Sequence, residues 1–247
     1  MHRFFVKREN VKGDKAFIEK DESHHIEKVL RLKPGDKIIL FDGRGTEYHA
    51  VLEKKVNNQL VALIQEICEI NNEPPLKVNL VQGIPKGDKM DLVIQKAVEL
   101  GVASIYPVVT TRTVVKLARD KAVKKAARWQ DIAIEACKQC RRNIIPEVKP
   151  VAAFSDILEI IGENWAIMLY EKEENARLKN ILREKKGTGE QEVFLLVGPE
   201  GGFAPHEAKL AQEKGIFLAG LGPRVLRTET AGIAGLSIIL YELGDLG

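Results

Sequence analysis

The sequence lacks the long apolar run of a membrane-spanning helix and the cysteine content of a disulfide-stabilised domain. Its longest uncharged apolar stretch, Ala231–Tyr241, has 11 residues, whereas a membrane-spanning helix needs about 20. The N-terminal apolar run ends after three residues, at Lys7, and so does not form the core of a secretory signal. Three cysteines in 247 residues are too few for a disulfide framework. We therefore expect a cytoplasmic protein, without membrane association, that is stabilised by its apolar core.

Motifs of several common enzyme and metal-protein classes are also missing. Cys137 and Cys140 form a single Cys-x-x-Cys pair, and the five histidines show no ligand spacing. We therefore expect that the protein binds no metal and that these cysteines have a structural role. No glycine-rich segment continues into Gly-Lys-Ser/Thr, which excludes a Walker A loop. Gly220-Leu221-Gly222 begins like a dinucleotide fingerprint, but Val225 stands where the third glycine belongs. The sequence has no Gly-x-Ser-x-Gly, so an esterase-type nucleophile has no support.

Positive charge is concentrated in one segment of a nearly neutral chain. The sequence has 38 Lys and Arg against 35 Asp and Glu, with 45% hydrophobic and 30% charged residues, which is the balance of a globular protein. Residues 112–149 contain eleven Lys and Arg and four acidic residues, a net charge of +7, so the rest of the chain sums to −4. Such a concentration is typical of a surface that binds a polyanion. A solvated helix surface is the alternative interpretation.

Residues 1–69 have the pattern of a small β-barrel with one helical insertion. Residues 38–42 and 46–52 flank a turn and predict a β-hairpin, and 59–68 predict a further strand. Apolar residues share one face over 24–32, which predicts a helix that ends before Pro34-Gly35. The sequence Asn-Asn-Glu-Pro-Pro at 71–75 interrupts all periodicity. We place a domain boundary there, which gives domains 1–72 and 73–247.

After this boundary, predicted strands and helices alternate. Strands are expected over 76–81, 105–109, 165–169, 193–197 and 216–219, and helices over 88–100, 121–140, 175–183, 205–214 and 229–243. The helix over 121–140 carries much of the basic segment. Repeated β-α alternation predicts an α/β domain whose largely parallel sheet is covered by helices on both faces.

Two glycine-rich turns follow predicted strands of this second domain, Gly198–Gly202 and Gly220–Gly222. Open α/β sheets bind ligands at the carboxyl ends of their strands, so we expect both turns to face one site. Tight connections without a ligand are the alternative. Thr228 is a candidate N-cap of the last helix. The charged residues beside it, Arg227 and Glu229, are candidates for a functional role.

The same residues carry a resemblance to a known family. Gly198–Gly202 and the string Leu221–Ala231 strongly resemble the bacterial small-subunit ribosomal RNA uridine N3-methyltransferases of the SPOUT superfamily. Further segments with this resemblance lie throughout the chain, at 2–5, 25–43, 95–102, 134–143 and 244–247. The resemblance therefore covers essentially the whole sequence.

The resemblance implies an α/β fold with an N-terminal PUA-like β-barrel and a C-terminal SPOUT α/β domain that contains a deep trefoil knot. It also implies the cofactor S-adenosyl-L-methionine and a homodimer with composite sites. The implied substrate is a specific uridine of 16S ribosomal RNA in the small ribosomal subunit, in the decoding region near the 3′ end. A knot breaks the usual rule that chain connections do not thread, so no periodicity argument predicts it.

Carried over position by position, the resemblance implies the cofactor-binding residues, and the chemistry and the basic segment add catalytic and RNA-binding candidates. The implied cofactor-binding residues are Leu169, Tyr170, Val197, Gly198, Pro199, Glu200, Gly201, Gly202, Leu218, Leu221, Gly222, Leu226, Arg227 and Thr228. The candidate catalytic residues are Arg142, Arg227, Glu200 and Glu229. The candidate RNA-binding residues are Arg3, Lys7, Arg8, Arg31, Arg112, Lys116, Arg128, Arg141 and Arg142. Arg141 departs from the family pattern, because relatives often have glycine there.

The chemistry assigns roles to these candidates. Loss of the N3 proton makes the uracil ring anionic, so we expect Arg142 and Arg227 to stabilise that charge and Glu200 or Glu229 to accept the proton. Two other classes of function stay open at this point. A non-catalytic RNA-binding or ribosome-assembly protein would not need two intact cofactor loops. An enzyme acting on a small acidic metabolite would not need the basic segment or the additional barrel.

Overall fold

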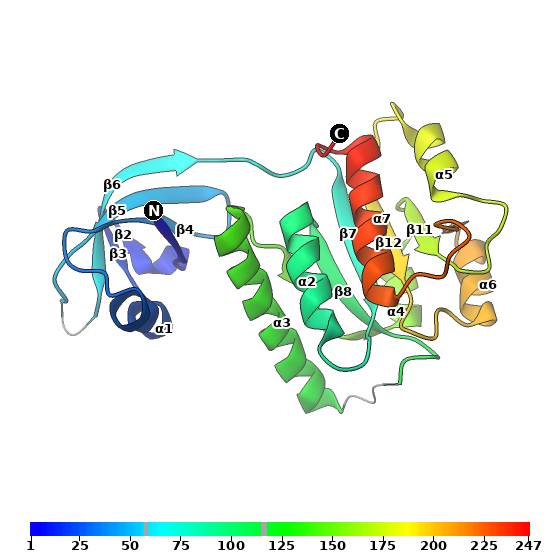
Figure 1. The fold of residues 1–247 in the computed structure, drawn as a ribbon, viewed down its shortest axis with the longest axis horizontal. Helices are drawn as coiled ribbons and strands as arrows, with labels where there is room; N and C mark the ends of the chain where they lie inside the picture. Colours follow the sequence, from blue (N-terminus) through cyan, green and yellow to red (C-terminus); the bar gives the residue numbers. More distant parts are fainter. Residues whose placement is uncertain (57–58, 115–117) are drawn as a thin grey trace. The chain divides into compact units, whose positions relative to one another are not determined.

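The computed structural model describes residues 1–56, 59–114 and 118–247, which form two compact units (Figure 1). The first unit contains Met1–Glu73 together with Cys137–Ile145, and the second contains Pro74–Ala136 and Pro146–Gly247. A segment from the middle of the chain therefore completes the N-terminal unit. The contiguous division into 1–72 and 73–247 that the sequence suggests stays a prediction.

The first unit is built on a six-stranded sheet with the order β1-β4-β5-β6-β3-β2. Its strands are β1 (His2–Phe5), β2 (Val11–Lys12), β3 (Lys15–Phe17), β4 (Lys37–Phe41), β5 (Thr46–Leu52) and β6 (Val61–Glu69). Strands β1 and β4 pair in parallel, and the other neighbours are antiparallel. The hairpin expected around Gly43–Gly45 is confirmed as β4 and β5. Phe4, Ile38 and Leu40 are among the buried side chains that form the core of this unit.

The helix expected over 24–32 begins and ends earlier and is not a single α-helix. A short 3-10 helix, η1 (Arg8–Asn10), precedes it, followed by α1 (Lys20–His24) and a π-helical segment, η2 (His25–Val29). The wider π-helical turn is closed by the bond from the Leu30 N–H to the His25 carbonyl, at 3.0 Å. Arg31, in the left-handed region at φ 56°, ends the helical path.

The second unit is an α/β structure whose sheet is entirely parallel, with the order β10-β8-β7-β12-β11-β13 and β9 paired to β8. The strands are β7 (Lys77–Gly83), β8 (Ser104–Val109), β9 (Glu147–Val148), β10 (Ala152–Ala153), β11 (Ala166–Leu169), β12 (Glu192–Val197) and β13 (Phe217–Ala219). The helices are α2 (Lys89–Leu100), α3 (Arg119–Cys140), α4 (Phe154–Ile161), α5 (Leu178–Lys185), α6 (Pro205–Glu213) and α7 (Thr228–Leu243). The last turn of α3 belongs to the first unit.

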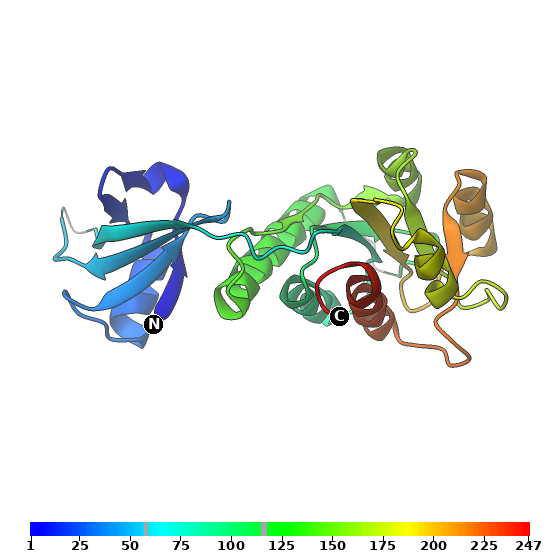
Figure 2. The same cartoon turned by 90° about the horizontal axis from the view of Figure 1, so that it is seen from above.

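Helices cover both faces of the parallel sheet, as the sequence predicts. Alternate residues of β12 point to opposite faces. Phe194 and Leu196 pack in one core with α4 and α6, whereas Leu195 contacts Gly235 of α7. Helices α2 and α7 lie side by side (Figure 2) and contact each other. Burial of both faces explains why the strands read as continuous apolar runs.

Two features of this unit differ from the sequence expectation. Helix α4 and the short strands β9 and β10 were not expected, although Phe154, Ile157, Leu158 and Ile161 have the spacing of one buried helical face. Helix α5 covers 178–185 and not 175–183, because the Glu173 side chain accepts bonds from the Asn175 and Ala176 N–H groups and Arg177 is extended in a bridge with Gly220. Among the residues that the structure describes, no helix has the length and apolar character needed to cross a membrane.

Candidate active site

A pocket of about 470 Å³ lies in the second unit, where β11, β12 and β13 end. It is lined by residues 169–171, 197–202 and 219–228, and Lys89 and Ala231 complete the lining. Neighbouring parallel strands end at the same edge of the sheet, so loops that are distant in sequence meet there. The structure thus brings together the two glycine-rich turns at one pocket.

Two glycines of the first turn are required, Gly198 by close contact with backbone and Gly202 by its backbone conformation. A Cβ at Gly198 would lie 2.9 Å from the backbone carbon of Gly202, and one at Gly202 would lie 2.7 Å from a carboxylate oxygen of Glu171. Gly202 also has φ 65°, a conformation that side-chain-bearing residues rarely adopt. The turn therefore folds tightly on itself and leaves its backbone open toward the pocket.

The hydroxyl of Thr228 belongs to a buried chain of hydrogen bonds beside the pocket. Thr228 Oγ1 donates to the carbonyl of Gly198 at 2.5 Å and accepts a bond from Gln82 Nε2 at 2.9 Å. The expectation that Thr228 caps the last helix is wrong, because Thr228 is the first residue of α7 and Arg227 occupies the cap position. Its hydroxyl holds the loop after β12 against the start of α7.

A lysine that the sequence analysis did not single out lies between the two candidate proton acceptors. Lys89 Nζ is 3.2 Å from Glu200 Oε1 and 3.5 Å from Glu229 Oε2. The backbone N–H of Lys86 also donates to Glu200 Oε1, at 3.0 Å. Burial raises the pKa of Glu200. Hydrogen bonds from the backbone N–H groups of Glu200 and Lys86, together with the nearby Lys89 ammonium, lower this pKa by more than burial raises it. The resulting pKa lies below its ordinary value.

Most of the expected cofactor-binding residues line this pocket, and Leu218 does not. Leu218 is buried in the core shared with α4 and α6. The pocket includes residues that sequence analysis missed, among them Lys89, Glu171 and Arg224. Glu171 and Arg224 adjoin motif residues, whereas Lys89 comes from the start of α2, so only the fold brings it here. Arg227 and Glu229 both lie at this edge, with Arg227 exposed and the Glu229 side chain 13% exposed.

Arg142, the other candidate for stabilising an anion, belongs to the first unit and does not line the pocket. Its Nε donates to Glu73 Oε1 at 3.0 Å, and a terminal nitrogen of the same guanidinium pairs with Glu73 Oε2. The Arg142 side chain is 6% exposed. Within the first unit, Arg142 thus forms a buried bidentate ion pair.

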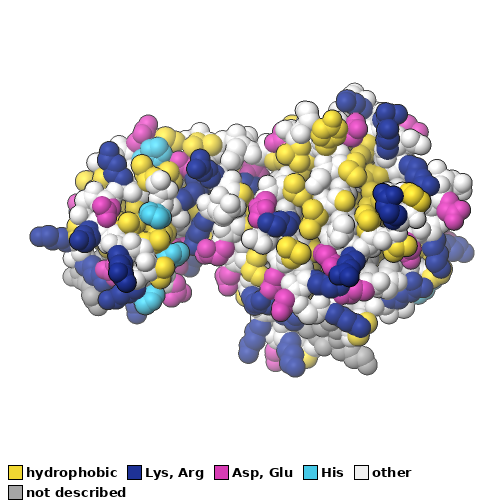
Figure 3. Space-filling model, viewed as in Figure 1, with side chains coloured by type: hydrophobic (Ala, Val, Ile, Leu, Met, Phe, Trp, Pro, Cys, Tyr) yellow, Lys and Arg dark blue, Asp and Glu magenta, His cyan; other side chains and the backbone are white. Residues whose placement is uncertain are grey.

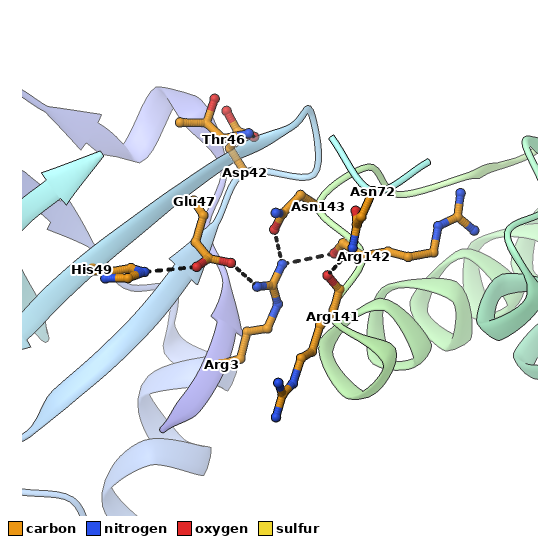
Figure 4. A network of polar contacts seen from close by, with 9 residues as sticks. All are labelled: Arg3, Asp42, Thr46, Glu47, His49, Asn72, Arg141, Arg142 and Asn143. Atoms are coloured by element: carbon orange, nitrogen blue, oxygen red, sulfur yellow. Dashed lines mark hydrogen bonds and ion pairs between the residues drawn. The ribbon is translucent and has the colours of Figure 1, made fainter. Parts of the chain in front are cut away.

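Arg3 lies at the centre of a polar network in the same unit (Figure 4). Its guanidinium pairs with Glu47 and with the side chain of Asn143, and it donates to the carbonyl of Arg142 at 3.0 Å. The Arg141 side chain points away from this network in Figure 4. Arg141 has φ 65°, and its carbonyl accepts a bond from Asn72 Nδ2 at 3.0 Å.

The remaining candidate RNA-binding residues differ in their surroundings. Arg8 and Arg31 are exposed, and Lys7 pairs with Glu19 at 2.9 Å. Arg112 donates to the carbonyl of Gly201 at 2.7 Å, which connects it to the pocket loop, and Arg128 pairs with Asp91. Lys116 lies outside the described residues. The RNA-binding role of each of these residues stays a prediction.

Comparisons with known proteins agree with this architecture. Residues 72–240 match a family model described as an RNA methyltransferase domain, and residues 18–65 match one described as an RNA methyltransferase PUA domain. These two matches, which together cover most of the chain, identify it as an RNA methyltransferase.

Individual relatives identify the family within the RNA methyltransferases. The ribosomal RNA small subunit methyltransferase E of Bacillus subtilis is 36% identical over 98% of this chain and 97% of its own length. A putative methyltransferase of Legionella pneumophila, solved with bound S-adenosylmethionine, has a TM-score of 0.89 at 36% identity and covers 99% of this chain and 98% of its own. The Neisseria gonorrhoeae ribosomal RNA small subunit methyltransferase E, also solved with S-adenosylmethionine, has a TM-score of 0.88 at 35% identity over 100% of both chains. This chain belongs to the ribosomal RNA small subunit methyltransferase E family, which confirms the resemblance found in the sequence.

Proposed function

We propose that this protein transfers a methyl group from S-adenosyl-L-methionine to N3 of one uridine in 16S ribosomal RNA, in the decoding region near the 3′ end. The pocket formed by both glycine-rich turns is the observation that carries this proposal. Family membership supports the small ribosomal subunit as the source of the substrate. The protein therefore acts in the cytoplasm, where ribosomal RNA is found.

The residues of the pocket fit the cofactor. The tight turn around Gly198 and Gly202 exposes backbone groups that can bind polar parts of a ligand, and Leu169, Val197 and Leu226 offer apolar surface for an adenine ring. The carboxylates of Glu171 and Glu200, which both line the pocket, suit a cationic ligand. S-adenosylmethionine supplies an electrophilic methyl group on its sulfonium. Because the Thr228 hydroxyl is used within the fold, Thr228 contributes through its backbone and by holding the loops.

The protein residues must admit the base and remove its proton. N3 lies on the Watson-Crick edge, so the uridine has to be unpaired or extruded into the pocket. We assign the proton to Glu229, because the contacts that lower the pKa of Glu200 oppose protonation of Glu200. Arg227 stabilises the uracil anion from the pocket edge. Arg142 would take part from the first unit of a second copy, because the family resemblance implies composite sites in a homodimer.

The architecture that supports this function is also part of the proposal. The six-stranded sheet closes as the PUA-like barrel, and the last strands with α7 form the deep trefoil knot of the SPOUT superfamily. Figure 3 shows apolar side chains on the face of the second unit that carries α7. Ile238 and Tyr241 of this helix are 37% and 62% exposed, which supports a homodimer that covers this face. The exposed residues Arg8 and Arg31, the half-buried Arg112 and other basic residues bind RNA phosphates.

The test is transfer of labelled methyl from S-adenosylmethionine to small ribosomal subunits from cells lacking this protein, followed by nucleoside analysis. N3-methyluridine at one position supports the proposal, and label on another base refutes the N3 assignment. Gly198→Ala provides the control, because its Cβ would collide with backbone and should abolish cofactor binding and transfer together. Absence of both transfer and calorimetric cofactor binding in the wild type would favour a non-catalytic RNA-binding protein.

A further inference from the structure

Lys89 is a cation held between two carboxylates, one within the first pocket loop and one just after the second. Glu200 belongs to the loop after β12, and Glu229 lies in the first turn of α7. Lys89 Nζ approaches them at 3.2 and 3.5 Å, and its side chain is 35% exposed. Lys89 also lines the pocket. Its ammonium is therefore accessible to a ligand and is the positive charge nearest to both carboxylates.

The two carboxylates hold Lys89 in different ways. Glu200 Oε1 accepts from the Lys86 N–H and lies next to Lys89, and these contacts lower its pKa, so Glu200 remains an anion. Glu229 Oε2 is buried and has no hydrogen-bond partner among the described residues. Its contact with Lys89 is long, at 3.5 Å. Glu229 thus has an oxygen that accepts no hydrogen bond from the described residues, and we assign the proton to this carboxylate.

Proton transfer to Glu229 would change the surroundings of Lys89. A neutral Glu229 no longer attracts the ammonium, whereas Glu200 still holds it at the pocket wall. Lys89 then has one anionic partner fewer at the moment when the uracil ring acquires a negative charge. A compact ammonium with three donors suits a single carbonyl oxygen better than the planar fork of an arginine.

We propose that Lys89 is a further catalytic residue, whose ammonium binds O2 or O4 of the uracil anion as its pairing with Glu229 weakens. This inference rests on the proposed function. The N3–H bond breaks and an O–H bond forms on Glu229. The N3 electron pair then forms the bond to the methyl carbon while the carbon–sulfur bond breaks, and its electrons leave with sulfur as a neutral thioether. The proton on Glu229 is finally released to water.

The experiment compares single-turnover methyl transfer by wild type and Lys89→Gln at saturating S-adenosylmethionine. Small subunits from cells lacking this protein are prepared with ordinary uridine or with 5-fluorouridine, whose N3 is more acidic. We expect Lys89→Gln to slow transfer to uridine by about 10²–10³-fold. The loss should be at least about tenfold smaller on 5-fluorouridine, because a more stable anion needs less stabilisation by charge.

The controls separate this role from a structural one. Lys86→Gln keeps the backbone N–H that binds Glu200 and changes an exposed side chain that does not line the pocket, so it should transfer at the wild-type rate. Lys89→Arg keeps the positive charge but not the compact ammonium, so its transfer rate should lie between those of Lys89→Gln and the wild type. It is the second test of this role if Lys89→Gln does not fold, and a wild-type rate in Lys89→Arg would then contradict the role. Calorimetric affinity for S-adenosylmethionine should change less than about threefold in Lys89→Gln, which corresponds to under about 1 kcal/mol.

The outcomes distinguish this inference from the proposed function. A wild-type rate in Lys89→Gln, an equal loss on both nucleosides, or a loss that follows cofactor affinity would each overturn the role of Lys89 while the methyltransferase assignment stands. If the wild type itself forms no N3-methyluridine, the proposed function fails and the role of Lys89 fails with it.

Discussion

The hydroxyl of Thr228 donates to the carbonyl of Gly198, 30 residues away in sequence, at 2.5 Å. Because Gln82 donates to the same hydroxyl at 2.9 Å, one side chain connects the ends of β7 and β12 to the start of α7. These contacts are buried. They fix the two pocket loops relative to each other before any ligand binds.

Replacing Thr228 by Val should therefore loosen the pocket. The substitution removes the hydroxyl donor of the buried Gly198 carbonyl and leaves the Gln82 amide with only its bond to the Gly83 carbonyl. We expect a cost of about 1–3 kcal/mol in the free energy of unfolding. Affinity for S-adenosylmethionine should fall in parallel. Urea denaturation and calorimetry measure the two effects, and Thr228→Ser, which keeps the hydroxyl, should resemble the wild type. Unchanged cofactor affinity in the Val variant would show that these bonds do not hold the pocket.

Arg142→Ala should destabilise the protein and also stop turnover. It leaves Glu73 without its bidentate partner, and breaking a buried ion pair costs about 3–5 kcal/mol. Affinity for S-adenosylmethionine should persist, since Arg142 does not line the pocket.

A double variant, Arg142→Met with Glu73→Leu, separates stability from chemistry. Removal of both charges should restore most of the free energy of unfolding, because no unpaired carboxylate remains. Methyl transfer should stay absent if the guanidinium acts on the substrate. A double variant that is both stable and active would limit Arg142 to a structural role.

Replacing Arg141 by Gly should leave the protein more stable than replacing it by Ala. At φ 65° a residue with a Cβ is strained by about 1–2 kcal/mol, and this strain persists in Arg141→Ala but not in Arg141→Gly. Both variants lose the same charged side chain. Arg141→Gly should therefore be more stable than Arg141→Ala by about 1 kcal/mol in chemical denaturation. Equal stability would mean that the loop relaxes to another conformation.

RNA affinity should depend steeply on salt, and the slope should identify the residues that contact phosphate. Each lost contact makes the plot of log affinity against log salt shallower by about 0.7–0.9. Arg8→Ala and Arg31→Ala remove exposed cations and should produce this change. Arg3→Ala removes a side chain that is 8% exposed and paired with Glu47, so it should change the slope less. An affinity that does not vary with salt would contradict phosphate binding.

Cys137 should resist alkylation, although it lies three residues from Cys140. Burial raises the pKa of Cys137 to about 12, and its thiol donates to the Ile144 carbonyl at 3.7 Å. At pH 8 the folded protein should react with iodoacetamide at Cys140, which is half-buried, and leave Cys137 unmodified in mass spectra. Rapid labelling of Cys137 in the folded protein would contradict this assignment.

The raised pKa of Cys137 also makes the free energy of unfolding fall at high pH. An unfolded thiol loses its proton near pH 9, whereas folded Cys137 keeps it to about pH 12. Within this range the unfolded state binds fewer protons, so the free energy of unfolding falls by about 1.4 kcal/mol per pH unit. Urea denaturation from pH 8 to 10.5 should reveal this slope in the wild type and a smaller slope in Cys137→Ala.

The sequence by itself determined the order of most strands and helices of the second unit, and it located both glycine-rich turns. Those features depend on local signals, since apolar periodicity and glycine turns involve residues close in sequence. It also identified the family, because Leu221–Ala231 is specific. Arg141 stands where relatives often have glycine. The backbone at this position is in the left-handed region, which explains why glycine suits the position.

Only the tertiary structure decided which side chains meet. Glu73 and Arg142 are 69 residues apart, and Lys89 reaches Glu200 and Glu229 because β7, β12 and α7 are neighbours in the fold. No local pattern marks such pairs, since each residue alone resembles an exposed charge. These charged side chains become buried, and come close enough to form ion pairs and line the pocket, only after the sheet has assembled.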